Sequence, residues 1–247
     1  MIKGILLAVI QAATEFLPVS SSGHLALISG IISKPDLFFF TALHLASLVA
    51  VVIFTRKEIA NLLSFERRYR RIWIYLIIAT VPAALCGVLF REAIEKAFSS
   101  FFFIGGAFIF TGVILFFTRF SKTHSDLNIK NSIIIGLFQM LALFPGVSRS
   151  GMTISSALFS GIDREKAVKF SFLLFIPLSL GAFLLEAREG FYFNAALVIS
   201  FFVCLIFSLV FLNLLFFVVK KGKLWLFSLY CFAAGLISFA ITGILKA

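Results

Sequence analysis

Gln11-Ala-Ala-Thr-Glu-Phe-Leu-Pro-Val-Ser-Ser-Ser-Gly23 occurs a second time, in altered form, as Gln139-Met-Leu-Ala-Leu-Phe-Pro-Gly-Val-Ser-Arg-Ser-Gly151. Both copies interrupt long apolar runs, and inside those runs only Glu15 and Arg149 are charged. Paired interrupted hydrophobic segments in two halves of a membrane protein predict a binding site where the halves meet. An ionisable residue within the membrane is costly, so Glu15 and Arg149 are candidate functional residues. The identical pairs include Gln11/Gln139, Val19/Val147, Ser20/Ser148, Ser22/Ser150 and Gly23/Gly151.

The composition is that of an integral membrane protein, with 61% hydrophobic and 13% charged residues and a mean hydropathy of +1.10. In a soluble protein a formal charge of +11 would suggest a nucleic-acid partner. Here the basic residues lie between apolar segments, as topology determinants do, so no nucleic-acid partner is expected. Cys86, Cys204 and Cys231 lie in apolar stretches without ligand spacing and indicate neither a disulfide nor a metal site. The first apolar run contains two polar residues and lacks a signal-peptidase site, so it is predicted to stay in the mature protein.

Six apolar stretches are long enough to span a bilayer, which takes roughly 20 residues. Four further arms are too short to span, and they flank the two copies of the repeated motif. Each pair of arms surrounds a Pro/Ser/Gly break and predicts a re-entrant helix hairpin, whose irregular backbone must face protein or a polar cavity. The spans are 37–55, 72–90, 101–118, 166–185, 191–219 and 224–245, and the arms are 4–17, 24–33, 131–144 and 151–162.

The order of these segments is a hairpin and three spans, followed by a hairpin and three spans. Because three is odd, the second unit is predicted to be inverted relative to the first. The expected fold is one all-α integral membrane domain, with a first inverted repeat at 1–119 and a second at 129–247. Outside the motif, fifteen Lys and Arg residues fall on one side of the spans and six on the other. The positive-inside rule then places both termini and the mouth of the first hairpin outside, and the mouth of the second in the cytoplasm.

Gln11 and Glu15 share one face of the first arm with the small residues Gly4 and Ala8, at helical spacing. One interpretation is that both side chains hold helices together by hydrogen bonds, with the small residues allowing close approach. The other is that an amide and a carboxylate one turn apart bind a divalent cation or orient a water molecule.

Serines follow the break in each hairpin, where the second helix of the hairpin is expected to begin. In the first hairpin this helix is expected to begin near His24. Serines at a helix N-terminus cap backbone N–H groups, and the same N–H groups and helix dipole make an anion site. Arg149 adds a guanidinium, which suits bidentate phosphate recognition. An arginine at a helix N-terminus is electrostatically unfavourable without an anion beside it, so we expect a bound phosphate there. The two hairpin starts predict a phosphate or diphosphate cradle that includes Ser20, Ser22, Ser148, Ser150 and Gly151.

Three histidines have different expected roles. His24 lies three residues after Ser21 and is a candidate general acid or base for that hydroxyl, although a lone intramembrane histidine also often serves in packing. His44 lies in a span whose polar residues are few, and it is expected to pack against the polar core. His124 lies in a charged loop and is expected to be solvated.

The motifs resemble those of the undecaprenyl-diphosphate phosphatases of the bacitracin-resistance type. Gln11, Glu15 and Pro-Val-Ser-Ser-Ser-Gly-His24 match the first family signature, with Gln11 as a glutamine variant, and Pro145-Gly-Val-Ser-Arg-Ser-Gly-Met-Thr153 resembles the second. The resemblance extends over nearly the whole chain. It implies hydrolysis of undecaprenyl diphosphate to the monophosphate and phosphate, with a divalent cation, Mg²⁺ or Ca²⁺, at Glu15 and Gln11. It also implies a bacterial inner-membrane enzyme, among inner-membrane lipids, whose site opens to the outer face and recycles the carrier lipid of cell-wall synthesis.

On this interpretation Arg149, together with Thr153 and the hairpin serines, binds the diphosphate. Ser21 attacks the phosphorus or holds it for water, and His24 transfers the proton. The main alternative is a transporter or flippase of an anionic prenyl lipid, because inverted repeats with broken helices are typical of transporters. A structural protein that binds anionic lipid would leave Glu15, His24 and Arg149 without a task. The residues leave the oligomeric state open, and a dimer is compatible with them.

Overall fold

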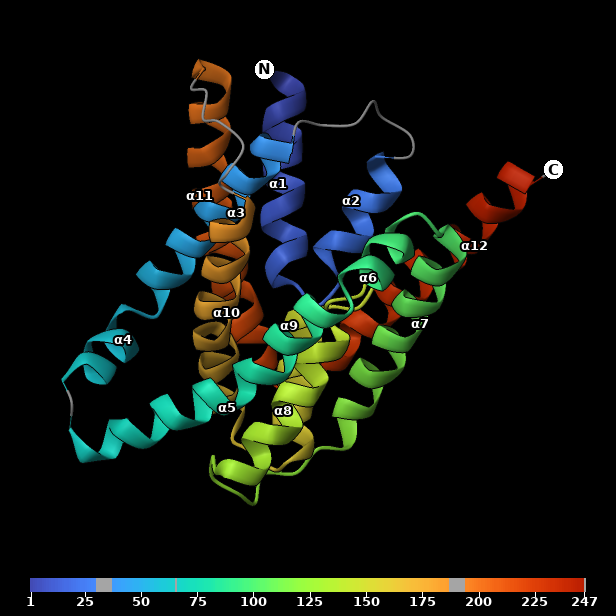
Figure 1. Ribbon diagram of the computed structural model, residues 1–247. Coiled ribbons are helices and arrows are strands. Elements are labelled where there is room, and N and C mark those ends of the chain that lie inside the picture. Colours follow the sequence, from blue (N-terminus) through green and yellow to red (C-terminus); the bar gives the residue numbers. More distant parts are fainter. Residues whose placement is uncertain (30–36, 65, 187–193, 247) are drawn as a thin grey trace.

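The computed structural model describes residues 1–29, 37–64, 66–186 and 194–246, and in these ranges the regular secondary structure is helical throughout (Figure 1). The only strand-like pairing in the same ranges is an isolated bridge between Ser125 and Ile162. The elements are α1 (Ile2–Phe16), α2 (Ser21–Ser29), α3 (Leu37–Phe54), α4 (Arg56–Leu63), α5 (Arg67–Leu89), α6 (Arg91–Phe98), α7 (Phe101–Phe117), η1 (Thr118–Phe120), α8 (Ile129–Leu141), α9 (Arg149–Phe159), α10 (Arg164–Glu186), α11 (Ala195–Lys220), η2 (Leu224–Leu226) and α12 (Phe227–Lys246).

The helices α5, α7, α10, α11 and α12 are each long and apolar enough to cross a membrane. A sixth candidate span, α3, meets the length test together with α4, to which it is joined by a bend of 71°. The bend lies at Thr55, where the apolar sequence of α3 gives way to the charged residues of α4. The protein is therefore an all-helical, multi-span membrane protein, as predicted. The short helices α4 and α6 were not predicted.

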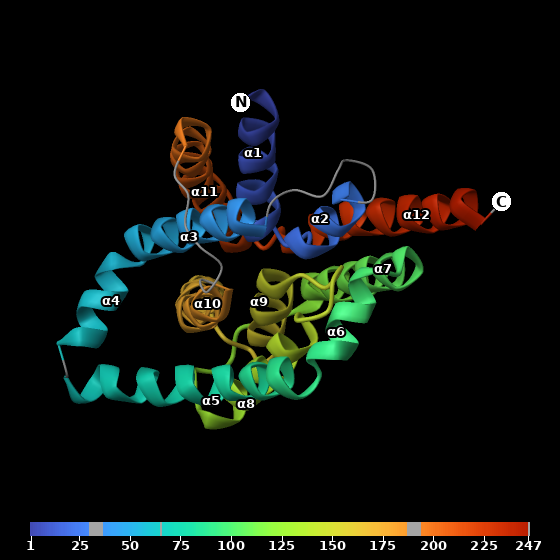
Figure 2. The ribbon, with the colours of Figure 1, turned by 45° about the horizontal axis from the view of Figure 1, so that its top comes forward.

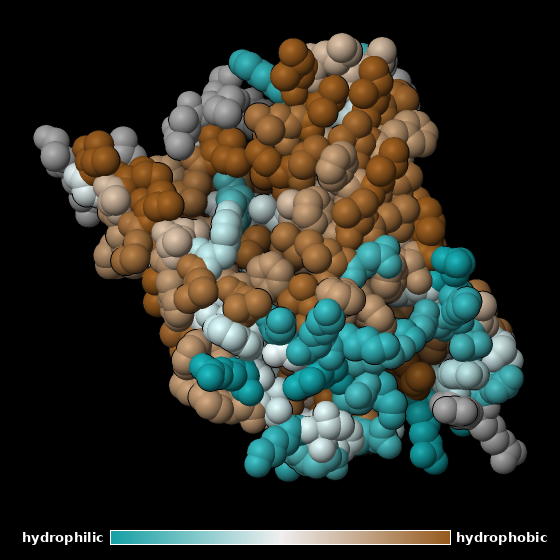
Figure 3. Space-filling view, turned by 180° about the vertical axis from the view of Figure 1, so that it is seen from behind, coloured by the Kyte–Doolittle hydropathy of each residue, from teal (hydrophilic) through white to brown (hydrophobic). Residues whose placement is uncertain are grey.

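Hydrophobic and hydrophilic surfaces are separated along the molecule. In the view from behind, apolar residues cover most of the upper part, and hydrophilic residues gather at the lower end (Figure 3). This end holds the α7–α8 and α9–α10 connections in Figure 1, and several of the basic residues that we assigned to the cytoplasm lie in or beside them. The distribution fits a molecule whose lower end lies in water and whose waist lies in lipid.

The two short-arm pairs form helix hairpins that enter from opposite ends, α1–α2 from the top of Figure 1 and α8–α9 from the bottom. The second arm of each hairpin begins earlier than expected, because Ser20 and Ser148 act as caps. The Ser20 and Ser148 hydroxyls accept hydrogen bonds from the backbone N–H groups three residues on, Gly23 at 3.3 Å and Gly151 at 3.1 Å. The other motif serines therefore lie in the first helical turn.

The tips of the hairpins contact each other in the middle of the molecule, as the sequence predicted. Gly146 N–H donates a hydrogen bond to the Ser20 hydroxyl at 3.2 Å, which joins the two breaks directly. Ser20 has a φ of 65° and Gly146 a φ of 93°. A positive φ is unusual for serine, and its side chain offsets the backbone cost by accepting two N–H groups, from Gly146 and from Gly23.

Gly23→Ala is expected to destabilise the protein, since the tips leave no room for a methyl group. A Cβ at Gly23 would lie 2.7 Å from a Phe108 ring atom and 2.8 Å from Gly146 Cα. Overpacking of this kind costs about 1–3 kcal/mol. Thermal unfolding in detergent should show a lower Tm for Gly23→Ala, whereas Gly106→Ala, whose Cβ would meet nothing within 4 Å, should not lower it. Equal melting temperatures would mean that the tips are less tightly packed than described.

The contacts between helices of the first half and helices of the second half occur in matching pairs. The arm α1 packs on α11 and the arm α8 on α5, while α3 packs on α10 and α7 on α12. An exchange of α1 with α8 and of α5 with α11 would produce this pattern. The inverted relation of 1–119 and 129–247 itself stays a prediction. In Figure 2, α10 is seen end-on between α3, α5 and α9, and its buried Phe172 and Phe175 pack edge-on against Phe16 of α1.

Candidate active site

The side chain of Glu15 is the centre of a polar cluster at the hairpin tips. It lies in the last turn of α1 and is 7% exposed. Its Oε1 accepts a hydrogen bond from Arg149 Nη2 at 3.0 Å. Its Oε2 accepts from Ser21 Oγ at 2.7 Å and from Gln11 Nε2 at 3.2 Å. The predicted residues Gln11, Glu15, Ser21 and Arg149 are thus brought together, from α1, α2 and α9.

Arg149 is the first residue of α9 and its side chain is 12% exposed. The guanidinium carbon lies 4.0 Å from the centre of the Phe175 ring, which favours a cation by its π face. We expected a phosphate to be the anion that Arg149 requires at a helix N-terminus. In this structure the Glu15 carboxylate provides that negative charge.

Ser21 and His24 have different partners from those expected. The Ser21 hydroxyl donates to Glu15, whereas both ring nitrogens of His24 bond elsewhere. His24 Nδ1 lies 2.7 Å from the Ser20 carbonyl oxygen, so Nδ1 carries the proton and donates it. His24 Nε2 lies 2.6 Å from the hydroxyl of Tyr230, whose ring stacks on the imidazole. The group within hydrogen-bonding distance of the Ser21 hydroxyl is therefore the Glu15 carboxylate and not the His24 imidazole, and the catalytic role of each stays a prediction.

The remaining predicted phosphate ligands are engaged in building the helix starts. The Ser22 hydroxyl lies 3.2 Å from that of Ser20, and the Ser150 hydroxyl 3.3 Å from that of Ser148. Thr153 donates to the Arg149 carbonyl oxygen, and its hydroxyl lies 2.6 Å from that of Ser171. Ser20, Ser148, Ser150 and Thr153 are all buried. These hydroxyls hold the tips in shape, and their part in ligand binding stays a prediction.

The donor set at Gln11 and Glu15 suits a cation that completes its shell with phosphate oxygens. Gln11 is fully buried and its carbonyl oxygen, Oε1, has no hydrogen-bond partner. An unpaired buried carbonyl and one carboxylate are hard oxygen donors, and Mg²⁺ is commonly held by one or two carboxylates together with substrate phosphates. In the described part of the chain no group of three or more His, Cys, Asp and Glu side chains could hold a metal by itself. The residues fit a cation held jointly with a ligand.

Two residues that contact the predicted site residues, His44 and Tyr230, were not themselves predicted as site residues. His44 of α3 was expected to pack against the polar core, and it does: its Nδ1 lies 3.2 Å from Gln11 Nε2 and its Nε2 3.4 Å from Glu15 Oε2. The polar residues Thr41, His44 and Ser47 recur along α3 at helical spacing, a pattern that could have indicated a functional face. Tyr230 has no such signal, because only the packing of α12 brings it to His24.

The three cysteines lie in the packed interior. Cys86, Cys204 and Cys231 are free and buried. Cys204 Sγ donates to the Leu43 carbonyl oxygen and Cys231 Sγ to that of Pro18, as weak donors within the core.

The family model described as "Bacitracin resistance protein BacA" matches residues 4–237, a range that contains both hairpins and the whole cluster. The chain belongs to the bacitracin resistance protein BacA family. Curated relatives named undecaprenyl-diphosphatase are similar over nearly their whole length. The protein of Thermosipho africanus is 42% identical, covering 96% of this chain and 98% of the relative. That of Methanococcus vannielii is 40% identical, covering 95% and 97%. The first signature of this BacA-family chain thus forms the α1–α2 tip, and the second forms the α8–α9 tip.

Proposed function

We propose that this BacA-family protein hydrolyses undecaprenyl diphosphate to undecaprenyl phosphate and inorganic phosphate. The observation that carries the proposal is the cluster around Glu15, which accepts a hydrogen bond from the Ser21 hydroxyl and forms an ion pair with Arg149. Ser21 is the first residue of α2 and Arg149 the first residue of α9. A nucleophile beside a base and a buried guanidinium is an arrangement for phosphoryl transfer. Transport of a lipid requires no nucleophile beside a base. The Ser21–Glu15 pair therefore favours hydrolysis over the transporter alternative.

Arg149 is the proposed ligand of the diphosphate. A guanidinium has five N–H donors, and Glu15 takes one hydrogen bond from it. The other donors, with the N–H groups at the start of α9, suit the oxygens of a terminal phosphate. A phosphate bound there competes with Glu15 for Arg149, so binding loosens the Glu15 carboxylate for its task as base. Ser20, Ser22, Ser148, Ser150, Gly151 and Thr153 are proposed to shape this cradle.

In the proposed reaction Ser21 Oγ attacks the terminal phosphorus and its proton passes to Glu15 Oε2, 2.7 Å away. The new O–P bond forms as the bond from phosphorus to the bridging oxygen breaks, and undecaprenyl phosphate leaves. The oxygen of a water molecule then bonds to phosphorus as the Ser21 Oγ–P bond breaks, inorganic phosphate leaves, and Glu15 returns its proton to Ser21 Oγ. Catalysis is by positioning and by neutralising charge on the phosphoryl group. Gln11 and Glu15 would hold Mg²⁺ or Ca²⁺, which supplies further positive charge to the phosphate oxygens.

The proposed place of this reaction is the bacterial inner membrane, with the site open to the outer face. The excess of Lys and Arg at the opposite end, 15 against 6 residues, supports this orientation. The mouth of the α1–α2 hairpin then faces outward, and carrier lipid released by cell-wall synthesis reaches Ser21 from that side.

His24 is proposed as the acid–base group of the second step, in which Nε2, held by Tyr230 in the ligand-free protein, accepts a proton from the attacking water. His24→Ala should lower kcat by about 100-fold or more, as loss of an acid–base group does. Tyr230→Phe removes one neutral hydrogen bond and keeps the stacked ring, so it should cost about 3- to 10-fold. Phosphate release by each purified variant checks both values. A Tyr230→Phe variant as slow as His24→Ala would mean that the phenol itself acts on the substrate.

The test of the proposed function is phosphate release from a long-chain prenyl diphosphate by purified protein, with and without chelator. Rapid acid quench with terminally labelled substrate should trap phosphate on Ser21 and not in Ser21→Ala. Ser64→Ala, at an exposed helix end, is the control and should retain label and turnover. If no metal condition gives phosphate release, hydrolysis is wrong and transport of the lipid takes its place. Release without label on Ser21 would make water the nucleophile.

A further inference from the structure

The imidazole of His44 is held in one tautomer by two neighbours in the Glu15 cluster. Its Nδ1 lies 3.2 Å from Gln11 Nε2, an atom that only donates, so Nδ1 accepts. The ring proton is therefore on Nε2, which lies 3.4 Å from Glu15 Oε2. His44 thus contacts both of the residues proposed to hold the cation.

The contacts of Gln11 Nε2 with Glu15 and His44 set the orientation of the Gln11 amide. Gln11 Nε2 donates to both Glu15 Oε2 and His44 Nδ1. A reversed amide would set Oε1 against the Glu15 carboxylate, which repels it, and would lose the hydrogen bond that His44 Nδ1 accepts in this tautomer. Oε1 is thereby kept off these two partners, and it is the buried oxygen without a hydrogen bond. An unpaired buried carbonyl costs free energy unless a ligand meets it.

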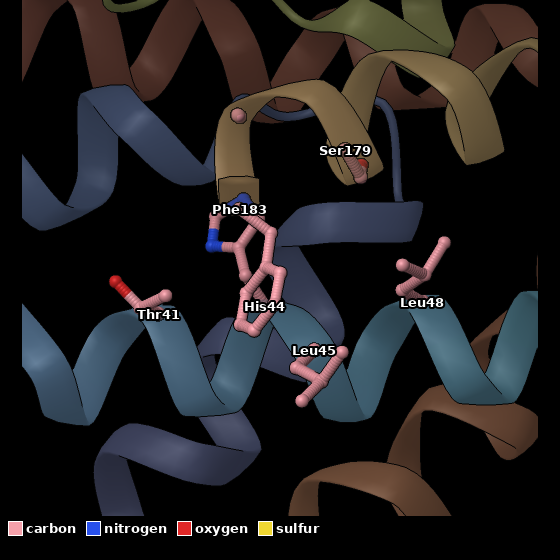
Figure 4. A pocket seen from close by; sticks show the side chains of 7 residues that line it. Thr41, His44, Leu45, Leu48, Ser179 and Phe183 are labelled. Atoms are coloured by element: carbon pink, nitrogen blue, oxygen red, sulfur yellow. The ribbon is translucent and has the colours of Figure 1, made fainter. Parts of the chain in front are cut away.

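His44 is also the member of this cluster that reaches open space. Its side chain is 42% exposed, against 7% for Glu15. It lines a pocket of about 70 Å³ between α3 and α10, where Thr41, His44 and Leu48 face Ser179 and Phe183 (Figure 4). This volume holds several water molecules. The ring can therefore be replaced by another side chain without opening a cavity in the core.

We propose that His44 is a positioning residue of the active site, which presents the Gln11 carbonyl oxygen to a divalent cation and orients the Glu15 carboxylate. The role rests on the proposed function, because it matters only if Gln11 and Glu15 hold a cation with the substrate. Outer groups that orient metal ligands in this way typically change metal affinity or activity by 10- to 100-fold when removed.

Two substitutions separate this role from simple packing. His44→Phe keeps a ring of similar shape and removes both nitrogens, whereas His44→Gln keeps one donor and one acceptor. The probe is Mn²⁺, whose binding to purified protein is measured by electron paramagnetic resonance with a methylene-bridged, non-hydrolysable prenyl diphosphate present. We expect His44→Phe to weaken Mn²⁺ binding by 10- to 100-fold and His44→Gln to stay within threefold of wild type. The same substitution at the exposed loop residue His124, His124→Phe, is the control and should change nothing.

A double-mutant cycle with Gln11→Leu provides a second readout. Once Gln11 has lost its amide, His44→Phe should have little further effect on Mn²⁺ binding, since the two side chains act as one unit. Wild-type Mn²⁺ binding by His44→Phe, an equal loss in His44→Gln, or additive losses in the cycle would each overturn the proposal. Glu15→Gln separates the two levels, because full turnover by that variant would refute the proposed site itself, whereas an inactive Glu15→Gln beside a normal His44→Phe refutes only the role of His44.

Discussion

Glu15→Gln is expected to reduce kcat for prenyl-diphosphate hydrolysis by about 100- to 10,000-fold, the range typical for loss of a general base. The amide keeps the size of the side chain and leaves Ser21 with no base at 2.7 Å. It also removes the carboxylate from the proposed cation site. Substrate binding should be reduced less than turnover, because the substrate phosphate no longer competes with the Glu15 carboxylate for Arg149.

The measurement for Glu15→Gln is single-turnover phosphate release, with binding of a non-hydrolysable analogue measured separately. Glu95→Gln is the matched control, since Glu95 is exposed and pairs with Arg91 one turn away. That change should leave kcat unaltered. Turnover by Glu15→Gln within threefold of wild type would remove the carboxylate from the mechanism.

Arg149→Lys should lower kcat/KM by about 30-fold or more, equivalent to roughly 2 kcal/mol for a lost charge-assisted bidentate contact. Lysine keeps the positive charge and loses the planar fork that matches phosphate. Arg149→Ala should be more severe. Kinetics on purified variants check both, and Arg119→Lys, outside the cluster, is the control. A normal kcat/KM in Arg149→Lys would show that charge alone suffices.

The stability of the ligand-free protein should respond to Arg149→Ala as well. If the substrate were the only anion beside Arg149, this substitution would be expected to leave the ligand-free protein at least as stable as before. The 3.0 Å pair with a nearly buried Glu15 reverses that expectation, because removing one partner leaves a buried charge uncompensated at a cost of about 3–5 kcal/mol. The double variant Glu15→Gln/Arg149→Met should then melt higher than Arg149→Ala. If Arg149→Ala melts like wild type, the ion pair adds nothing to folding.

The fold was predictable because lipid leaves few choices. Apolar length alone gave the spans, and a Pro/Ser/Gly break within a run too short to span gave each hairpin. Glu15 and Arg149 stood out for the same reason, since charge inside apolar sequence is rare. Their contact with each other was a different matter, because it depends on two tips that meet only after both halves have packed.

The partners of Ser21 and His24 show where sequence spacing misleads. Their separation of three residues on a helix suggested that the Ser21 and His24 side chains contact each other. The turn at Ser20, with its positive φ, instead aims the Ser21 hydroxyl back at Glu15 across the hairpin. His24 turns its ring to Tyr230, which lies 206 residues away in the chain. Neither the angle between α1 and α2 nor the position of α12 can be calculated from residue spacing.

The ion pair at the tips also determines how late in synthesis the site can be completed. Glu15 and Arg149 are separated by 134 positions. At a synthesis rate of 5–20 residues per second, roughly 7 to 27 s pass between the two leaving the ribosome. During that interval the first hairpin carries its carboxylate without the guanidinium, and Ser20 lacks the Gly146 N–H that steadies its turn. Both contacts between the tips therefore form only when the second hairpin arrives, and that step completes the buried ion pair.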